Sequence, residues 1–168
     1  MAQPRYILRP FDANDAHLLR GWLRTPEVMR WWGDPQQQLQ VLMADLHDAR
    51  MRQWIANIED QPFAYLQAFP AHEWPQSHLL HLPDGTEAVD MCIGVPDLLG
   101  RGHGSALLKQ FADALIAAGA SAVAIDPDLA NHRARRAYQN AGFEVDSFVE
   151  SGEGPVVVMV YKPKVLNV

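Results

Sequence analysis

Two segments in the second half of the chain constrain its fold more than any other feature. The first covers residues 99–105 and reads Leu-Gly-Arg-Gly-His-Gly-Ser, directly before a helical pattern. Small residues ahead of a helix let backbone N–H groups close around an anion, because no Cβ blocks the approach and the helix N-terminus carries partial positive charge. We therefore predict a phosphate-binding loop in which the backbone from Gly100 to Ser105 provides the donors.

The second segment is a helix that presents small side chains on one face. Residues 131–143 read Asn-His-Arg-Ala-Arg-Arg-Ala-Tyr-Gln-Asn-Ala-Gly-Phe. Helical spacing puts Ala134, Ala137, Tyr138 and Ala141 on one face, and Gly142 is placed to end the helix. A stripe of alanines beside one phenol lets another molecule lie close against this helix.

The remaining pattern is that of an α/β chain with a mixed sheet. Apolar runs predict strands at residues 6–8, 53–58, 63–69, 88–94, 122–125, 143–149 and 156–161. Helices are predicted after Asp12 or Asn14, around residues 39–46, after the glycine loop, and over the second segment, with Trp31-Trp32-Gly33 in a connection. Residues 70–85, with three prolines and three histidines, are predicted to form a long loop, which in a compact domain is usually functional or disordered.

Length and charge limit the classes of protein that this chain can represent. At 168 residues it is long enough for one domain, spanning 1–168, and too short for two of typical size. A formal net charge of -6 disfavours a nucleic-acid binder, which usually shows a basic patch, and suits a cationic partner. No apolar run of signal-peptide length opens the chain, and Asp113 interrupts the longest mostly apolar stretch, 111–125. We therefore expect a cytoplasmic protein with no membrane association.

Cysteine and histidine usage argues against a metal site. One cysteine, Cys92, excludes an internal disulfide and a cysteine-based metal cluster. His72, His78 and His81 lie in one loop, but their spacing matches no helical His-x-x-x-His pair. We predict no metal, and we interpret Cys92 as a buried small residue because nothing near it marks a nucleophile.

Taken together, the two segments resemble the acetyl-CoA-binding elements of the GNAT acetyltransferase superfamily. Glycine loop, helix, strand and then Asn-x-x-Ala-x-x-x-Tyr with a final Gly-Phe occur in the same order and spacing. The usual Arg or Gln at the head of the loop is Leu99 here, so one side-chain contact to phosphate is lost. The resemblance implies a single GNAT-type domain, with a strongly twisted mixed sheet of about six to seven strands flanked by about four helices.

The resemblance also implies acetyl-CoA as co-substrate and acyl transfer to a nucleophile, most often an amine. The residues then expected to bind acetyl-CoA are Cys92, Ile93, Gly94, Gly100, Arg101, Gly102, His103, Gly104, Ser105, Asn131, Ala134 and Tyr138. A lysine-like amine has a pKa of about 10.4 and is mostly protonated near neutral pH, so the reaction needs a base and an acid for the departing thiolate. The resemblance puts Tyr138 in the position of the acid; the alternative is a ring that packs beside the cofactor without proton transfer.

Further residues narrow the resemblance to the aminoglycoside 6'-N-acetyltransferases. Asp90 begins a run that leads into the glycine loop, Trp31-Trp32-Gly33 precedes the second predicted helix, and Tyr65-x-Gln67 and Asp126-Pro127 belong to strands or follow them. The resemblance implies that Asp90 is the general base and that Asp126, at the carboxyl end of a strand, lines the acceptor site. The residues expected to contact a small cationic amine are Trp31, Trp32, Tyr65, Gln67, Asp90 and Asp126.

Other functions share parts of this pattern. The acetylases of hydroxylated lysine in siderophore synthesis share the Gly-x-Pro-x-x-Leu-Gly-Arg-Gly run of residues 94–102, but usually have histidine where this chain has Asp90. A protein amine is a further acceptor, and a non-catalytic acyl-CoA-binding module is the competing class. Asp90 and Tyr138 argue against that class, since binding alone needs neither. We expect a monomer or a homodimer.

Overall fold

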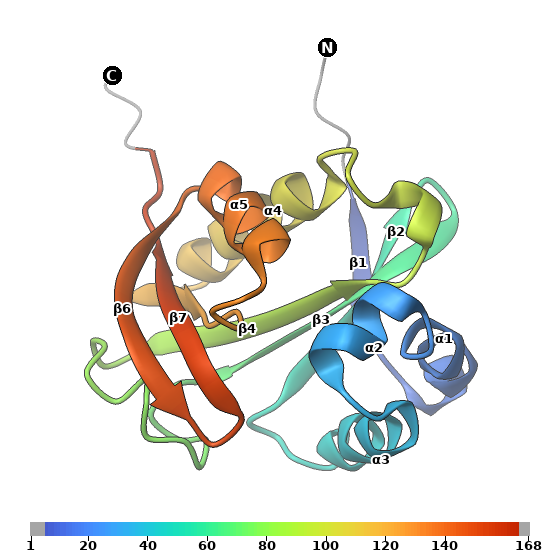
Figure 1. Cartoon of the computed structure of the whole chain (residues 1–168), viewed down its shortest axis with the longest axis horizontal. Helices are drawn as coiled ribbons and strands as arrows, with labels where there is room; N and C mark the ends of the chain where they lie inside the picture. Colours follow the sequence, from blue (N-terminus) through green and yellow to red (C-terminus); the bar gives the residue numbers. More distant parts are fainter. Residues whose placement is uncertain (1–5, 165–168) are drawn as a thin grey trace. The chain divides into compact units, whose positions relative to one another are not determined.

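Strands and helices follow one another along the chain much as the apolar pattern predicts. The structure is a computed structural model that describes residues 6–164. Its strands are β1 (Ile7–Pro10), β2 (Arg52–Ile58), β3 (Gln61–Pro70), β4 (Thr86–Ile93), β5 (Ala122–Ile125), β6 (Phe143–Ser151) and β7 (Gly154–Tyr161). Its helices are α1 (Ala16–Trp22), α2 (Pro26–Trp32), α3 (Pro35–Asp45), α4 (His103–Ala117) and α5 (His132–Ala141), with two 3-10 helices, η1 (Ala13–Asp15) and η2 (Pro96–Leu98) (Figure 1).

The strands hydrogen-bond in the order β1-β2-β3-β4-β5-β7-β6 and form one seven-stranded sheet. β4 and β5 are parallel, whereas the pairs β1/β2, β2/β3, β5/β7 and β6/β7 are antiparallel. The predicted α/β class and mixed sheet are confirmed. Residues 1–5 and 165–168, which the domain prediction includes, lie outside the described residues.

The structure has five α-helices where about four are predicted. The additional helix is α2, in the segment that the sequence pattern places in a connection. It starts at Pro26, a residue whose fixed φ suits the first helical position, and it ends at Gly33 with a φ of 84°. Only Val28 of its seven residues is buried, so the sequence of α2 lacks the repeated apolar positions that would predict a helix. Trp31 and Trp32 are therefore the last two residues of a helix.

The described chain forms two compact units, and strand β4 contributes to both. The first unit comprises the residues up to Phe69 together with Asp90–His103. Helices α1, α2 and α3 gather in it beside β1, β2 and β3 (Figure 1). The second unit comprises Pro70–Val89 together with the residues from Gly104 onward. It holds α4, α5 and the long β6/β7 hairpin.

In the second unit the observed elements agree closely with the predicted ones. β5 has the predicted bounds, and residues 71–85 contain no helix or strand, as expected of the long loop. α5 ends at Gly142, which adopts the left-handed conformation with a φ of 109°. No helix within residues 6–164 is long and apolar enough to cross a membrane.

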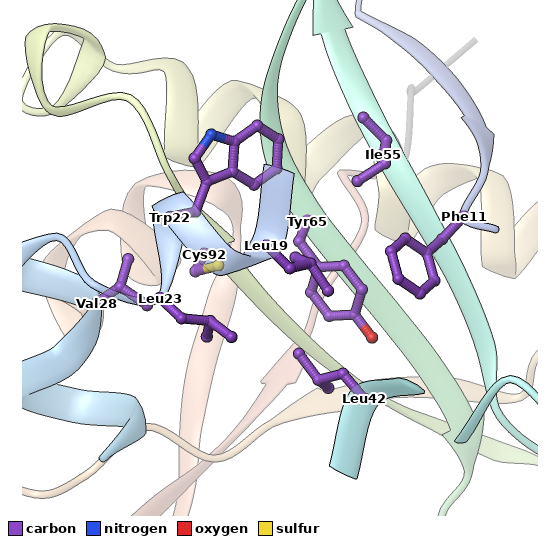
Figure 2. Close-up of a cluster of buried hydrophobic side chains, with 9 residues drawn as sticks. All are labelled: Phe11, Leu19, Trp22, Leu23, Val28, Leu42, Ile55, Tyr65 and Cys92. Carbon is purple, nitrogen blue, oxygen red and sulfur yellow. The ribbon is translucent and has the colours of Figure 1, made fainter. Parts of the chain in front are cut away.

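The core of the first unit is a cluster of buried side chains between the helices and the sheet (Figure 2). Leu19, Trp22 and Leu23 come from α1 and the residue that follows it. They pack with Phe11, Val28, Leu42, Ile55, Tyr65 and Cys92. The helix predicted after Asp12 or Asn14 is confirmed, and its apolar side chains contribute to this core.

Gly94 leaves the space that Trp22 of this core occupies. A Cβ added to Gly94 would lie 1.9 Å from Trp22 Cγ, far inside van der Waals contact. The Gly94 N–H donates to the Phe63 carbonyl oxygen at 2.8 Å, so the backbone is held in place beside β3. Gly94 was predicted to bind acetyl-CoA; its missing side chain has a structural reason that the sequence did not reveal.

We predict that Gly94→Ala destabilises the protein by at least about 3 kcal/mol, because neither the indole nor the hydrogen-bonded backbone can move away without disturbing the core. Chemical denaturation followed by tryptophan fluorescence measures the change. Gly21→Ala is the matched control: Gly21 lies in α1 with no atom near the added Cβ, so the change should be neutral or stabilising by up to about 1 kcal/mol. Equal stability of the Gly94→Ala variant and the wild type would contradict this account of the packing.

Candidate active site

Asp90 lies on β4 in the first unit, and its carboxylate is partly buried. The side-chain amide of Gln67, on β3, donates from Nε2 to Asp90 Oδ2 at 2.9 Å. A carboxylate is costly to bury unless donors surround it, and Gln67 is one such donor. The structure thus brings together two of the residues predicted to contact the acceptor.

Tyr65, also predicted to contact the acceptor, is completely buried. Its hydroxyl accepts a hydrogen bond from Gln53 Nε2 at 2.9 Å and donates to Gln67 Oε1 at 2.8 Å. Burial raises the pKa of the Tyr65 phenol well above its usual value, so the group remains a neutral donor. The predicted direct contact with the acceptor is corrected: Tyr65 stands behind Gln67, inside the core.

The two adjacent tryptophans have different surroundings. The Trp32 ring meets the Tyr65 ring edge to face with centroids 6.2 Å apart, and it packs against the hydrophobic core. The Trp31 ring is half-buried and has the guanidinium carbon of Arg30 4.8 Å from its centroid. One tryptophan therefore supports the core, and the face of the other already accepts a cation.

Cys92 is buried in the core of the first unit, as predicted. Burial raises the pKa of its thiol to about 12. A thiol that remains protonated is a poor nucleophile, so the chemistry of Cys92 is that of a small apolar side chain. Any contact with acetyl-CoA would have to come from its backbone or from neighbouring Ile93.

The glycine loop lies directly before a helix, α4, as the sequence predicts. After η2, Gly100 and Gly102 adopt positive φ values of 72° and 84°, which residues with a Cβ rarely adopt. No atom lies within 4 Å of the position of a Cβ on Gly102, and Arg101 is exposed. Gly100, Arg101 and Gly102 are exposed at the start of α4, a position at which backbone N–H groups suit a phosphate group.

His103 opens α4 and is tied to the core of the first unit. Its Nδ1 hydrogen-bonds with the Tyr6 hydroxyl at 2.9 Å, and its ring meets those of Tyr6 and Phe63 edge to face. Its predicted role is to bind the cofactor. The structure adds a structural role, because His103 packs and hydrogen-bonds with residues of the first unit.

In the second unit, α4 and α5 are joined by a side chain from the predicted cofactor loop. Ser105 Oγ donates to the Ala137 carbonyl oxygen at 2.8 Å, so this hydroxyl is used within the protein. Asn131 caps α5 by accepting from the Ala134 N–H at 3.2 Å. Tyr138 lies one turn after Ala134 and is half-buried. The Asn131 cap and the hydrogen bond from Ser105 hold α5, the helix that carries the predicted acid, in place.

Asp126 follows β5 and pairs with a histidine of the long loop. His78 Nε2 lies 2.6 Å from Asp126 Oδ2, and the two side chains are 11% and 23% exposed. His81 faces Asp146 and His72 faces Asp84, so each loop histidine has a different carboxylate. Sequence reasoning considered these histidines only as metal ligands and missed the pairs, because partners 48 and 65 residues apart share no periodic pattern.

The elements and their geometry agree with known acetyltransferases. Residues 12–151 match the acetyltransferase (GNAT) domain family. The chain belongs to the GNAT acetyltransferase family. It is 27% identical over 165 residues to aminoglycoside N(6')-acetyltransferase type 1 from Klebsiella pneumoniae, an alignment that covers 91% of this chain and 81% of that protein.

Solved structures extend the similarity of this GNAT domain to three dimensions. It superposes with a TM-score of 0.84 and 26% identity on AAC(6')-Ib in complex with paromomycin and acetyl-CoA, over 93% of this chain and 92% of the other. The same TM-score, with 25% identity and coverage of 93% and 94%, is found for AAC(6')-Ib with coenzyme A and kanamycin. The resemblance inferred from the glycine loop and the Asn-to-Tyr helix is thereby confirmed at the level of family and fold.

Proposed function

We propose that this GNAT domain transfers the acetyl group of acetyl-CoA to the 6'-amine of an aminoglycoside. The observation that carries the proposal is the Asp90 carboxylate, held on β4 by Gln67 at 2.9 Å, in a chain whose relatives are named aminoglycoside N(6')-acetyltransferases. A carboxylate that accepts a hydrogen bond from an amide remains able to take a proton from an ammonium group. Residues 1–168 then act as one catalytic domain, since β4 belongs to both units.

The features of the donor side support acetyl-CoA as co-substrate. Gly100 and Gly102 are exposed and have positive φ values, and no atom lies within 4 Å of the position of a Cβ on Gly102, so this backbone is accessible to a pyrophosphate. Gly104 and Ser105 lie in the first turn of α4, and helical spacing puts Ala134 and Ala137 of α5 on the same face as Tyr138. Because acetyl-CoA is an intracellular metabolite, we place the protein in the cytoplasm.

The features of the acceptor side support a small polycationic molecule. Asp90 and Asp126 provide negative charge, and the Trp31 ring, which has Arg30 over one face, can hold a further cation only on its other face. The formal net charge of -6 adds a general attraction for cations. An acceptor with several ammonium groups gains from each of these, whereas a singly charged amine gains less. The active species is a monomer or a homodimer.

In the proposed mechanism transfer is direct, within a ternary complex. Asp90 takes a proton from the 6'-ammonium group, and the free amine nitrogen attacks the thioester carbon. The new C–N bond forms, the C–S bond breaks, and Tyr138 gives its phenolic proton to the departing thiolate. The nitrogen then loses its second proton, which leaves the neutral amide and restores the Tyr138 phenol. The residues thus have separate tasks: Asp90 acts on the acceptor, Tyr138 acts on the leaving group, and Asp126 binds charge.

We predict that Asp90→Asn lowers kcat for kanamycin acetylation by about 10²- to 10⁴-fold, because an amide cannot accept the ammonium proton. Asp126→Asn should instead raise KM, and more so at low salt, where attraction between charges is least screened. Asp60→Asn, in the exposed β2/β3 turn, is the control and should change neither constant. Thiol release from acetyl-CoA measures all four proteins. If the protein acetylates a hydroxylated lysine or a protein amine but no aminoglycoside, the proposed acceptor is wrong and the proposed acetyl transfer still holds.

We predict that Tyr138→Phe lowers kcat by about 10²- to 10⁴-fold and leaves the Kd for acetyl-CoA nearly unchanged, since the ring remains and only the proton is lost. Calorimetry gives the affinity, and steady-state kinetics gives kcat. Tyr161→Phe, which removes a phenol from the same unit, should keep the wild-type kcat. Equal rates for Tyr138→Phe and the wild type would reduce Tyr138 to a packing residue.

A further inference from the structure

A continuous line of hydrogen bonds runs through the core of the first unit and ends at Asp90. Gln53 Nε2 donates to the Leu42 carbonyl oxygen at 2.8 Å and to the Tyr65 hydroxyl at 2.9 Å. Tyr65 donates to Gln67 Oε1 at 2.8 Å, and Gln67 Nε2 donates to Asp90 Oδ2 at 2.9 Å. Gln53, Tyr65 and Gln67 are 7%, 0% and 8% exposed, so water has little access to these groups.

The direction of the line is fixed by its first member. The Leu42 backbone oxygen can only accept, so the Gln53 atom that faces it must be the amide nitrogen. The same nitrogen uses its second hydrogen on the Tyr65 oxygen, which leaves the phenolic hydrogen free for Gln67. With its carbonyl oxygen engaged by Tyr65, Gln67 must turn its NH₂ group towards Asp90.

The strand register explains why these residues meet. In the antiparallel β2/β3 pair, Gln53 is opposite Gln67 and Ile55 is opposite Tyr65, so the polar side chains share one face of the sheet. α3 supplies the terminal acceptor through Leu42, and β4 supplies Asp90. Figure 2 shows the Tyr65 ring in the middle of the cluster, with its oxygen directed towards Leu42.

We propose that Gln53, Tyr65 and Gln67 form a one-directional donor chain that orients the Asp90 carboxylate and favours its ionised form. Gln67 and Tyr65 are thus positioning residues for the general base, a role that rests on the proposed function. A hydrogen bond to the charged form of a carboxylate stabilises that form, and a fixed amide also limits its rotation. The apolar surroundings strengthen each hydrogen bond in the line.

The titratable groups around the line leave its direction unchanged across the working pH range. Burial raises the pKa of Tyr65 well above its usual value and that of Cys92 to about 12, so both keep their protons. Asp45, near the end of α3, is the other acid that faces Tyr65, and burial raises its pKa, with Asp48 adding to the effect. An Asp45→Asn background separates its titration from that of Asp90.

The side-chain amide of Gln67 is a direct spectroscopic probe of the proposal. We expect its ¹H and ¹⁵N NMR signals to titrate with Asp90, and the titration to disappear in Asp90→Asn. In Tyr65→Phe the amide loses its fixed orientation, so the signals should move towards those of a free amide and the midpoint should rise by about 0.5 to 1 pH unit. Gln53→Leu, which keeps the Tyr65 ring, should shift the midpoint in the same direction by less.

Tyr6→Phe is the matched control, because it removes a buried phenol of the same unit that bonds to His103; the Gln67 signals should stay unchanged. The donor chain would be contradicted, whatever the acceptor is, if the Gln67 signals titrated unchanged in Asp90→Asn or were the same in Tyr65→Phe and the wild type. In kinetics with kanamycin, Tyr65→Phe should lower kcat about tenfold at constant KM for acetyl-CoA. An unchanged kcat, with the NMR shifts present, would overturn the positioning role alone.

Discussion

The need to give the buried side chains of Tyr65 and Gln67 hydrogen-bond partners shapes the first unit. The side chains of β3 from Phe63 to Phe69 are all buried, and Tyr65 and Gln67 are among them. An unpaired buried hydroxyl or amide costs about 1–3 kcal/mol, so a stable fold must supply hydrogen-bond partners for these two side chains. Gln53 from β2, the Leu42 carbonyl from α3 and Asp90 from β4 meet that need together. The positions of these elements and the setting of the candidate base therefore have one cause.

β4 connects this core to the glycine loop. Cys92 of this strand packs in the core, and Gly94, the next residue after the strand, makes room for Trp22. Gly100 and Gly102, which have positive φ values, come a few residues later in the chain. A strand with no exposed residue that leads into an exposed glycine loop at the start of a helix fits an enzyme that binds an anionic donor beside a carboxylate. The same short segment supplies the base and, through its backbone, the phosphate contacts of the proposed mechanism.

The sequence predicted the elements with a strong local signal and missed those that depend on distant partners. The strand at 122–125 and the end of α5 at Gly142 follow from apolar runs and glycine chemistry. α2 was missed because Val28 is its one buried residue. Tyr65 and Gln67 were predicted as acceptor contacts, but Gln53 gave no signal, since only the β2/β3 register places it opposite Gln67. The turn alone would place Gln53 opposite Leu66. The one-residue shift in register between Ala56 and Asn57 places it opposite Gln67 instead, and simple alternation within the hairpin does not indicate that shift.

The position of the transferred acetyl group tests the proposed function most directly. The protein is incubated with ¹³C-labelled acetyl-CoA and kanamycin, and the product is assigned by NMR. The account predicts one acetyl group, bonded to the 6'-nitrogen, formed by the wild type and nearly absent with the Asp90→Asn variant. Acetyl transfer to another position of the sugar, or the same product at the same rate from both proteins, would contradict it.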